Sequence, residues 1–171
     1  MGDSVEPFDE LMGDLDHPMI IVTTAVDEVR AGCLVGFHAQ CGIDPPLYSV
    51  WLSKANHTYR IGALADTFAV HFPTPTNRAL AELFGTTTGN ETDKFERCSW
   101  TPGPDGVPML DDCPERFVGR RNALLDPGAD HVCLMLSPIE AAHAGGRDWL
   151  TFAQVADLEA GHPAEDRQRP V

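Results

Sequence analysis

Residues 32–58 read GCLVGFHAQCGIDPPLYSVWLSKANHT, and this stretch decides the fold. Gly32 and Gly36 flank a short apolar segment, and glycines in a strand allow another group to approach the backbone closely. Without a ligand, they would simply mark bulges in an ordinary strand. An Asp-Pro-Pro turn follows, and it should stand just before the next strand because proline cannot donate to a central ladder. That strand is expected at Leu47–Leu52, which is rich in apolar and aromatic residues.

The polar run Ser53–Thr58 (SKANHT) follows this strand and opens a predicted helix, with Asn56 as its N-cap. Free backbone N–H groups and the positive end of the helix dipole favour an anion at such a position. Lys54 adds a positive charge beside them. The phosphate of a nucleotide-like cofactor is the natural guest, whereas the alternative is plain capping by Asn56 with no ligand.

Further strands and two helices are predicted on either side of this stretch, from apolar runs and capping residues. The strands are expected at Met19–Thr24, Ala31–Val35, Thr67–Phe72, Arg116–Leu124, His131–Leu136 and Trp149–Val155. The turn Thr101–Val107 is expected to join two more strands. The helices are expected at Asn56–Asp66 and from Pro75 to Phe84, the second capped by Thr74 and ended by Gly85, with a further helical turn at Asp93–Arg97. Many short strands with frequent turns favour a closed or partly closed antiparallel barrel, a mainly-β fold with short helices.

Composition excludes several functional classes. The chain has 171 residues, 43% hydrophobic and 22% charged, with a formal charge of −14. A surface this acidic repels nucleic acid and anionic lipid, so neither is an expected partner. No run reaches the roughly 18 apolar residues of a membrane span, and no secretory signal is visible. A cytoplasmic protein with one domain is therefore expected.

The cysteines and the two ends of the chain complete this description. Five cysteines with no CxxC pair indicate reduced thiols, and no metal site is expected because candidate ligands are scattered. Residues 1–17 form an acidic N-terminal arm, residues 18–158 the folded domain, and residues 159–171 a polar C-terminal tail.

Several motifs resemble a known family when they are taken together and in order. The stretch at residues 32–58 resembles the flavin reductase-like domain of the FMN-binding split-barrel superfamily. The runs TFAVHF (67–72), DKF (93–95), GVPML (106–110) and DHV (130–132) resemble later segments of the same family. The resemblance extends from about Pro18 to Glu140.

This resemblance implies a split β-barrel, six-stranded, antiparallel and of Greek-key type. It implies a homodimer with the flavin at the subunit interface. It further implies FMN or FAD as cofactor, NADH or NADPH as electron donor, and a separate monooxygenase as a possible partner.

The resemblance also assigns roles to individual residues, position by position. The phosphate turn matches Ser53, Lys54, Asn56 and Thr58, and the segment beside the flavin ring matches Cys33, Leu34, Val35, Gly36, Phe37 and His38. His131 matches a histidine near the nicotinamide and is the expected catalytic residue, while Lys94 and Phe95 match residues close to the cofactor.

Four positions depart from the family pattern. Leu34 and Gly36 stand where hydroxyl residues are usual, His38 stands for Phe, and Gln40 stands for Ser. Each lost hydroxyl removes a hydrogen bond worth roughly 0.5–1.5 kcal/mol net. The alternative hypothesis is therefore a non-catalytic or slow protein that binds flavin, deazaflavin or haem. For His38, a core histidine bonded to backbone is an equal alternative.

Overall fold

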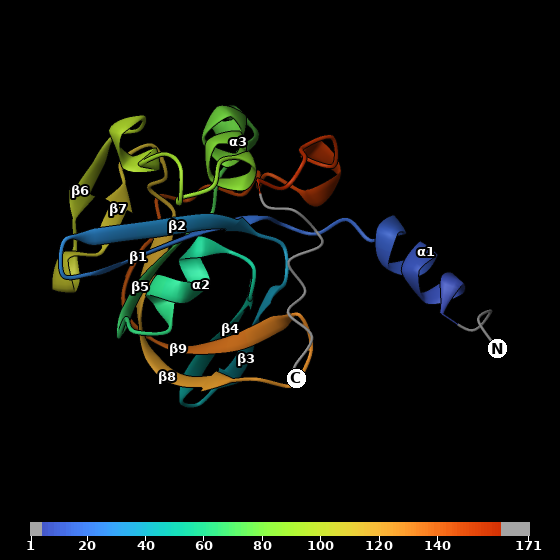
Figure 1. Ribbon diagram of the computed structural model, residues 1–171, viewed down its shortest axis with the longest axis horizontal. Helices are drawn as coiled ribbons and strands as arrows, with labels where there is room; N and C mark the ends of the chain where they lie inside the picture. Colours follow the sequence, from blue (N-terminus) through green and yellow to red (C-terminus); the bar gives the residue numbers. More distant parts are fainter. Residues whose placement is uncertain (1–4, 162–171) are drawn as a thin grey trace.

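The computed structural model describes residues 5–161 and consists mainly of one curved antiparallel sheet (Figure 1). The seven strands lie in the order β2-β1-β5-β8-β9-β4-β3. Their bounds are β1 Ile20–Val26, β2 Val29–Val35, β3 His38–Ile43, β4 Pro46–Ser53, β5 Thr67–His71, β8 Arg116–Leu125 and β9 His131–Ala142. A separate two-stranded sheet pairs β6 Trp100–Pro102 with β7 Pro108–Leu110 across the 3₁₀ turn Pro104–Gly106.

The main core lies inside the curved sheet, where apolar side chains from one face of several strands pack together. β1 and β5 are buried on both faces, because the first five residues of β1 and every residue of β5 are buried. The fully buried members of the main core come from strands far apart in the sequence: Ile20, Val22, Val50, Phe68, Val70, Val132, Leu134 and Leu136. This packing confirms the mainly-β, antiparallel prediction.

The expected six strands become seven because the chain bends at Gly36-Phe37. These two residues alone separate β2 from β3, which lie at opposite edges of the sheet. Where the edges approach each other, the Trp51 backbone N–H donates to the Phe37 carbonyl at 2.9 Å. Counted as one bent strand, β2 and β3 give the predicted number of six.

Helix α2 (His57–Gly62) begins as predicted, since the Asn56 side-chain oxygen accepts from the Thr58 backbone N–H at 2.9 Å. It is shorter than expected and ends at Gly62, where a Cβ would lie 3.2 Å from the ring of Phe68. The close packing of α2 on this core residue fixes the position of the polar turn that precedes it.

Helix α3 differs from the prediction at both ends. Residues Pro75–Asn77 form a 3₁₀ turn, and α3 itself runs over Arg78–Thr86. Gly85 therefore lies inside the helix rather than beyond its end. The physical reason is close packing, because a Cβ on Gly85 would lie 3.0 Å from Leu34 Cδ2 of β2.

The segment Trp149–Val155 is not a strand. Only Thr151 pairs with Pro18, as an isolated bridge, and Phe152–Gln154 form a 3₁₀ turn. Thr151 and Gln154 cap this turn through each other's side chains and backbones, and such local bonds compete with a strand ladder.

The acidic N-terminal arm contains helix α1 (Glu6–Asp14), which projects away from the barrel in Figure 1. The predicted helical turn near Asp93 is present as the 3₁₀ turn Lys94–Glu96. Most of the expected polar tail lies outside the described residues. Across residues 5–161, no helix combines the length and apolar character needed to span a membrane.

Candidate functional site

A cavity of about 520 Å³ opens where the end of β2, the end of β4 and the start of β9 meet. This volume lies within the range of small-molecule sites. The sequence-predicted residues that line it are Cys33, Leu34, Val35, Gly36, Phe37, Ser53, Asn56 and His131. Segments far apart in the chain therefore converge on one cavity, joined there by Met12 and Gly13 of the arm and by Phe152.

The polar end of the cavity is formed by Ser53 and Asn56. The Ser53 hydroxyl accepts from the Ala55 backbone N–H at 3.3 Å, which leaves its own proton free to donate. Asn56 uses its oxygen as the helix cap, so its side-chain amide N–H groups are available. Two neutral donors thus face a cavity at the start of a helix, an arrangement suited to phosphate oxygens.

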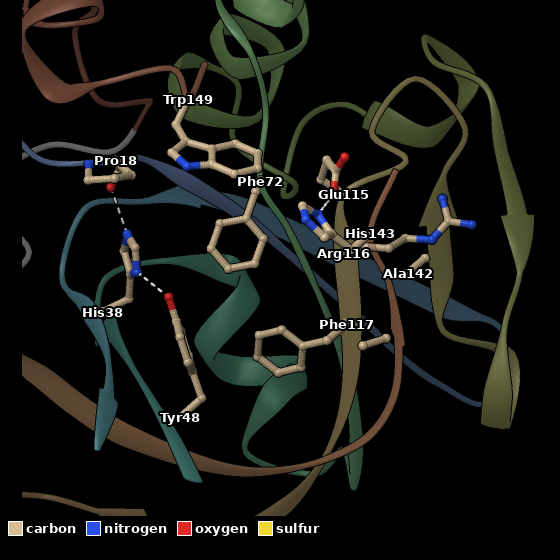
Figure 2. Close-up of a pocket in the computed structure, with 11 residues that line it drawn as sticks. Pro18, His38, Tyr48, Phe72, Glu115, Arg116, Phe117, Ala142, His143 and Trp149 are labelled. Atoms are coloured by element: carbon tan, nitrogen blue, oxygen red, sulfur yellow. Dashed lines mark hydrogen bonds and ion pairs between the residues drawn. The ribbon is translucent and has the colours of Figure 1, made fainter. Parts of the chain in front are cut away.

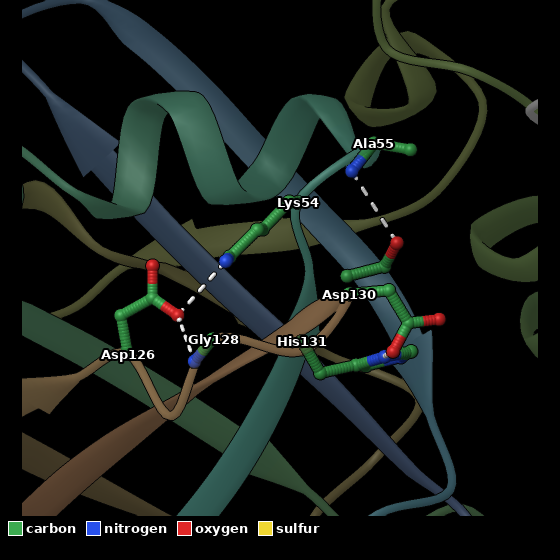
Figure 3. A network of polar contacts seen from close by, with 7 residues as sticks. Lys54, Ala55, Asp126, Gly128, Asp130 and His131 are labelled. Carbon is green, nitrogen blue, oxygen red and sulfur yellow. Dashed lines mark hydrogen bonds and ion pairs between the residues drawn. The ribbon is translucent and has the colours of Figure 1, made fainter. Parts of the chain in front are cut away.

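Lys54 and Thr58 belong to the same turn but do not line the cavity. Lys54 Nζ donates to Asp126 Oδ1 at 2.8 Å, and the Gly128 backbone N–H donates to the same oxygen (Figure 3). The Lys54 hydrogen bond, followed by that from Gly128, lowers the pKa of Asp126. Thr58 is buried in the core. The lysine charge is therefore already paired beside the turn rather than directed into it.

The β2 side of the cavity offers mainly backbone. The Leu34 side chain packs against Gly85 of α3, and β2 is an edge strand with one row of N–H and C=O groups outside the ladder. Burial raises the pKa of the Cys33 thiol, although a hydrogen bond with Thr58 opposes the shift. Cys33 is thus a protonated core thiol, and hydrogen bonding at this wall comes from the main chain.

His17 is a cavity residue that sequence reasoning missed. Its Nε2 atom is buried and has no hydrogen-bond partner among the described residues, and its ring stacks on Phe152 at 5.3 Å. A Cβ on Gly36 would lie 3.1 Å from this Nε2, so Gly36 leaves room for the histidine. A lone histidine before a strand carries no local signal of this role, because the contact depends on the folded arm.

His131 reaches the cavity at the first residue of β9. The Lys54 backbone N–H donates to the Asp130 carbonyl at 2.9 Å, which ties the start of β9 to the polar turn. His131 Nδ1 lies 3.0 Å from Asp130 Oδ1, and its ring meets that of Phe37 edge-on with centroids 5.3 Å apart. Phe37 is 61% exposed, so this aromatic pair forms an open rim.

The model of the flavin reductase-like domain matches residues 12–159. The chain belongs to this family. It is 28% identical over 152 residues to FMN reductase (NADH) SmoA of Agrobacterium fabrum, covering 89% of this chain and 84% of that protein. It is 23% identical over 158 residues to the flavin-dependent monooxygenase reductase subunit HsaB of Rhodococcus jostii, covering 91% and 70%.

A solved structure has the same fold as this flavin reductase-like chain. The NADH:FAD oxidoreductase SgcE6 of Streptomyces globisporus superposes with a TM-score of 0.79 at 18% identity, covering 90% of this chain and 91% of that one. At this identity the likeness establishes the split-barrel fold.

Besides Lys54 and Thr58, three family-matched residues lie away from the cavity of this flavin reductase-like domain. Lys94 is buried, and its Nζ donates to the carbonyls of Gly32 at 2.9 Å and Phe84 at 3.1 Å. Burial also lowers the pKa of Lys94. Phe95 packs edge-on against Phe84 in the core, with ring centroids 5.5 Å apart. His38 faces a second cavity, so the structure does not bring these residues to the predicted site.

No cluster of three or more metal-ligating side chains occurs within residues 5–161.

Proposed function

We propose that this protein is an NAD(P)H-dependent flavin reductase that binds FMN or FAD in the cavity between β2, β4 and β9. The observation that carries the proposal is the convergence of phosphate donors, an open backbone edge and an aromatic-histidine rim on one cavity. Membership of the flavin reductase-like domain family supports the same conclusion.

The residues present fit a flavin at both of its ends. Ser53 and Asn56 supply neutral hydrogen-bond donors for a phosphate. A strongly acidic protein needs such local donors to hold an anion. The backbone of edge strand β2 beyond Gly32, whose carbonyl Lys94 occupies, and the orphaned His17 Nε2 supply hydrogen-bonding groups for the polar rim of a heterocycle. The absent hydroxyls at Leu34 and Gly36 are thus offset by main-chain groups and a histidine.

When bound, the flavin supplies the hydride-accepting ring, and the protein supplies position and electrostatics. Phe37 and His131 form the rim on which a nicotinamide can approach, and Asp130 holds the His131 ring by accepting from Nδ1. Their role is to exclude water and orient the donor, because hydride transfer requires no side-chain nucleophile.

We further propose a homodimer whose interface borders this cavity, and a separate monooxygenase as consumer of the reduced flavin. The apolar side chain of Phe37, which lines this cavity and is 61% accessible, supports a covering subunit. The relative HsaB is named a monooxygenase reductase subunit, which supports the second part.

The substitution Asn56→Asp tests the proposed phosphate site without removing the helix cap. Aspartate caps a helix as well as asparagine does, but it lacks the amide donor and brings a negative charge to the phosphate. Losing one charge-assisted hydrogen bond costs about 1.5–3 kcal/mol, so FMN affinity should fall by at least about tenfold. Titration of flavin fluorescence measures this affinity.

Asn122→Asp is the matched control, because Asn122 is an exposed residue of β8 that does not line the cavity, and its amide donates to the Ser137 hydroxyl at 3.4 Å. It introduces the same change in net charge away from the cavity and should leave FMN affinity unchanged. Equal affinities for the two variants would overturn the proposed position of the phosphate. The melting temperature of each variant reports whether the fold is intact.

A further inference from the structure

A second cavity of about 380 Å³ lies on the other side of the bend between β2 and β3 (Figure 2). It shares no lining residue with the first cavity. The neighbouring residues Phe37 and His38 face different cavities, Phe37 the first and His38 the second. The proposed flavin reductase activity makes no use of this second cavity.

Four aromatic side chains form its walls: Tyr48, Phe72, Phe117 and Trp149. The Tyr48 ring meets the Phe117 ring edge-on with centroids 5.1 Å apart, and the ring centroids of Phe72 and Trp149 lie 5.9 Å apart. Figure 2 shows these rings around a common space, with His38 at its edge. Faces and edges of aromatic rings favour another planar ring as occupant.

The hydrogen bonds of His38 determine what the cavity can offer a polar group. His38 Nε2 lies 2.7 Å from the Pro18 carbonyl, so it must carry a proton and donate. Burial lowers the pKa of His38, which keeps the ring neutral and makes Nδ1 an acceptor. The Tyr48 hydroxyl, 2.6 Å away, therefore donates to Nδ1. Its oxygen then retains capacity to accept one hydrogen bond from a ligand.

Among the described residues, Arg116 is the one lysine or arginine that lines the cavity, and its buried Nε has no hydrogen-bond partner there, but its guanidinium is not directed at the space between the rings. Arg116 Nη1 donates to the carbonyls of Leu110 and Cys113, and Figure 2 shows its guanidinium turned away from the four rings. The Glu115 carboxylate accepts from His143 Nδ1 at 2.6 Å and from two backbone N–H groups, which occupy both of its oxygens. The available chemistry is thus apolar, aromatic and hydrogen-bond accepting.

We propose that this second cavity binds a small uncharged aromatic molecule that carries a hydroxyl group, of the phenol class. The rings of Tyr48, Phe72, Phe117 and Trp149 hold the aromatic body, and the ligand hydroxyl donates to the Tyr48 oxygen. An apolar analogue would expel water from that oxygen without replacing its hydrogen bond.

Ligand-observed NMR titration of the full chain with phenol, fluorobenzene and benzoate tests this assignment. Phenol is expected to bind at least about threefold more tightly than fluorobenzene, which resembles it in size but has no donor. Benzoate, an anion, is expected to show no saturable binding over the same range. Equal or tighter binding of fluorobenzene or benzoate would overturn the proposed ligand class.

The variant Ala142→Phe locates the binding, because Ala142 lines the cavity and a phenyl group there would fill part of it. Phenol affinity should fall by about tenfold or more. Ala39→Phe is the control, since Ala39 follows His38 on β3 and its side chain points to the opposite face. Unchanged phenol binding in Ala142→Phe, or displacement of phenol by FMN, would overturn the assignment to this cavity.

Discussion

His71 makes the stability of this protein depend on pH in a window that the structure defines. The imidazole is fully buried, its Nδ1 donates to the Ile21 carbonyl at 3.1 Å, and its Nε2 accepts from the Leu110 backbone N–H at 3.0 Å. Burial, the largest cause, lowers its pKa from 6.5 to about 3. The neutral ring therefore joins β1, β5 and β7.

The sign of the effect follows from proton counting. Below pH 6.5 the unfolded chain binds a proton at this histidine while the folded chain does not, so stability falls with pH until about pH 3. Between pH 7 and pH 5 this single group removes about 2 kcal/mol from the free energy of unfolding. Carboxylates titrate mainly below this interval.

Urea unfolding followed by tryptophan fluorescence at pH 7 and pH 5 measures this quantity. In His71→Gln, a side chain that can still donate and accept but does not titrate, the pH-dependent loss should be smaller by about 2 kcal/mol. His57→Gln, at the half-buried start of α2, is the matched control for replacing a histidine outside the core. If His71→Gln loses as much stability as the wild type between the two pH values, the conclusion that the buried imidazole of His71 is neutral is wrong.

Three further outcomes are expected. Lys94→Met should lower the free energy of unfolding by about 2 kcal/mol, because two buried carbonyls lose their donor. FMN affinity, measured by titration, should stay unchanged. A large loss of affinity with intact stability would contradict the structural role of Lys94. Glu115→Gln should lower the melting temperature at pH 7 and weaken the further decline of the melting temperature below pH 4.5. The reason is that hydrogen bonds from Gly146 and His143 lower the pKa of Glu115. An unaltered melting profile would refute this. Brief alkylation of the native protein, read by mass spectrometry, should modify exposed Cys41 and spare buried Cys33; preferential labelling of Cys33 would show an open core.

Local patterns predicted the features that depend on local physics. Asn56 could be assigned as a helix cap because the side chain bonds a backbone N–H only two residues away. Short apolar runs separated by frequent turn residues predicted the mainly-β fold, because strands and turns are also specified by neighbouring residues. The prediction of a strand at Trp149–Val155 was wrong, because the mutual capping of Thr151 and Gln154 forms a 3₁₀ turn there despite the apolar composition.

The candidate site was predictable where the motif itself forms it, and at His131, which the family resemblance matched. Gly36, Ser53 and Asn56 lie within one continuous stretch and come together at the cavity. His17 could not be found, because its position depends on the distant Phe152, whose ring stacks on the imidazole and whose backbone N–H donates to the His17 carbonyl. Lys94 was expected near the cofactor, but a buried ammonium needs carbonyl partners, and the structure gives it two beneath β2.

The most direct test of the central claim is anaerobic reduction of added FMN or FAD by NADH or NADPH with the purified wild-type protein. Loss of the oxidised flavin absorbance should match NAD(P)H consumed one for one, depend on protein concentration, and be slower at subsaturating flavin in Asn56→Asp than in Asn122→Asp. Saturable flavin binding with no protein-dependent NAD(P)H consumption, with either flavin and either donor, would contradict the reductase function while leaving the cofactor site standing.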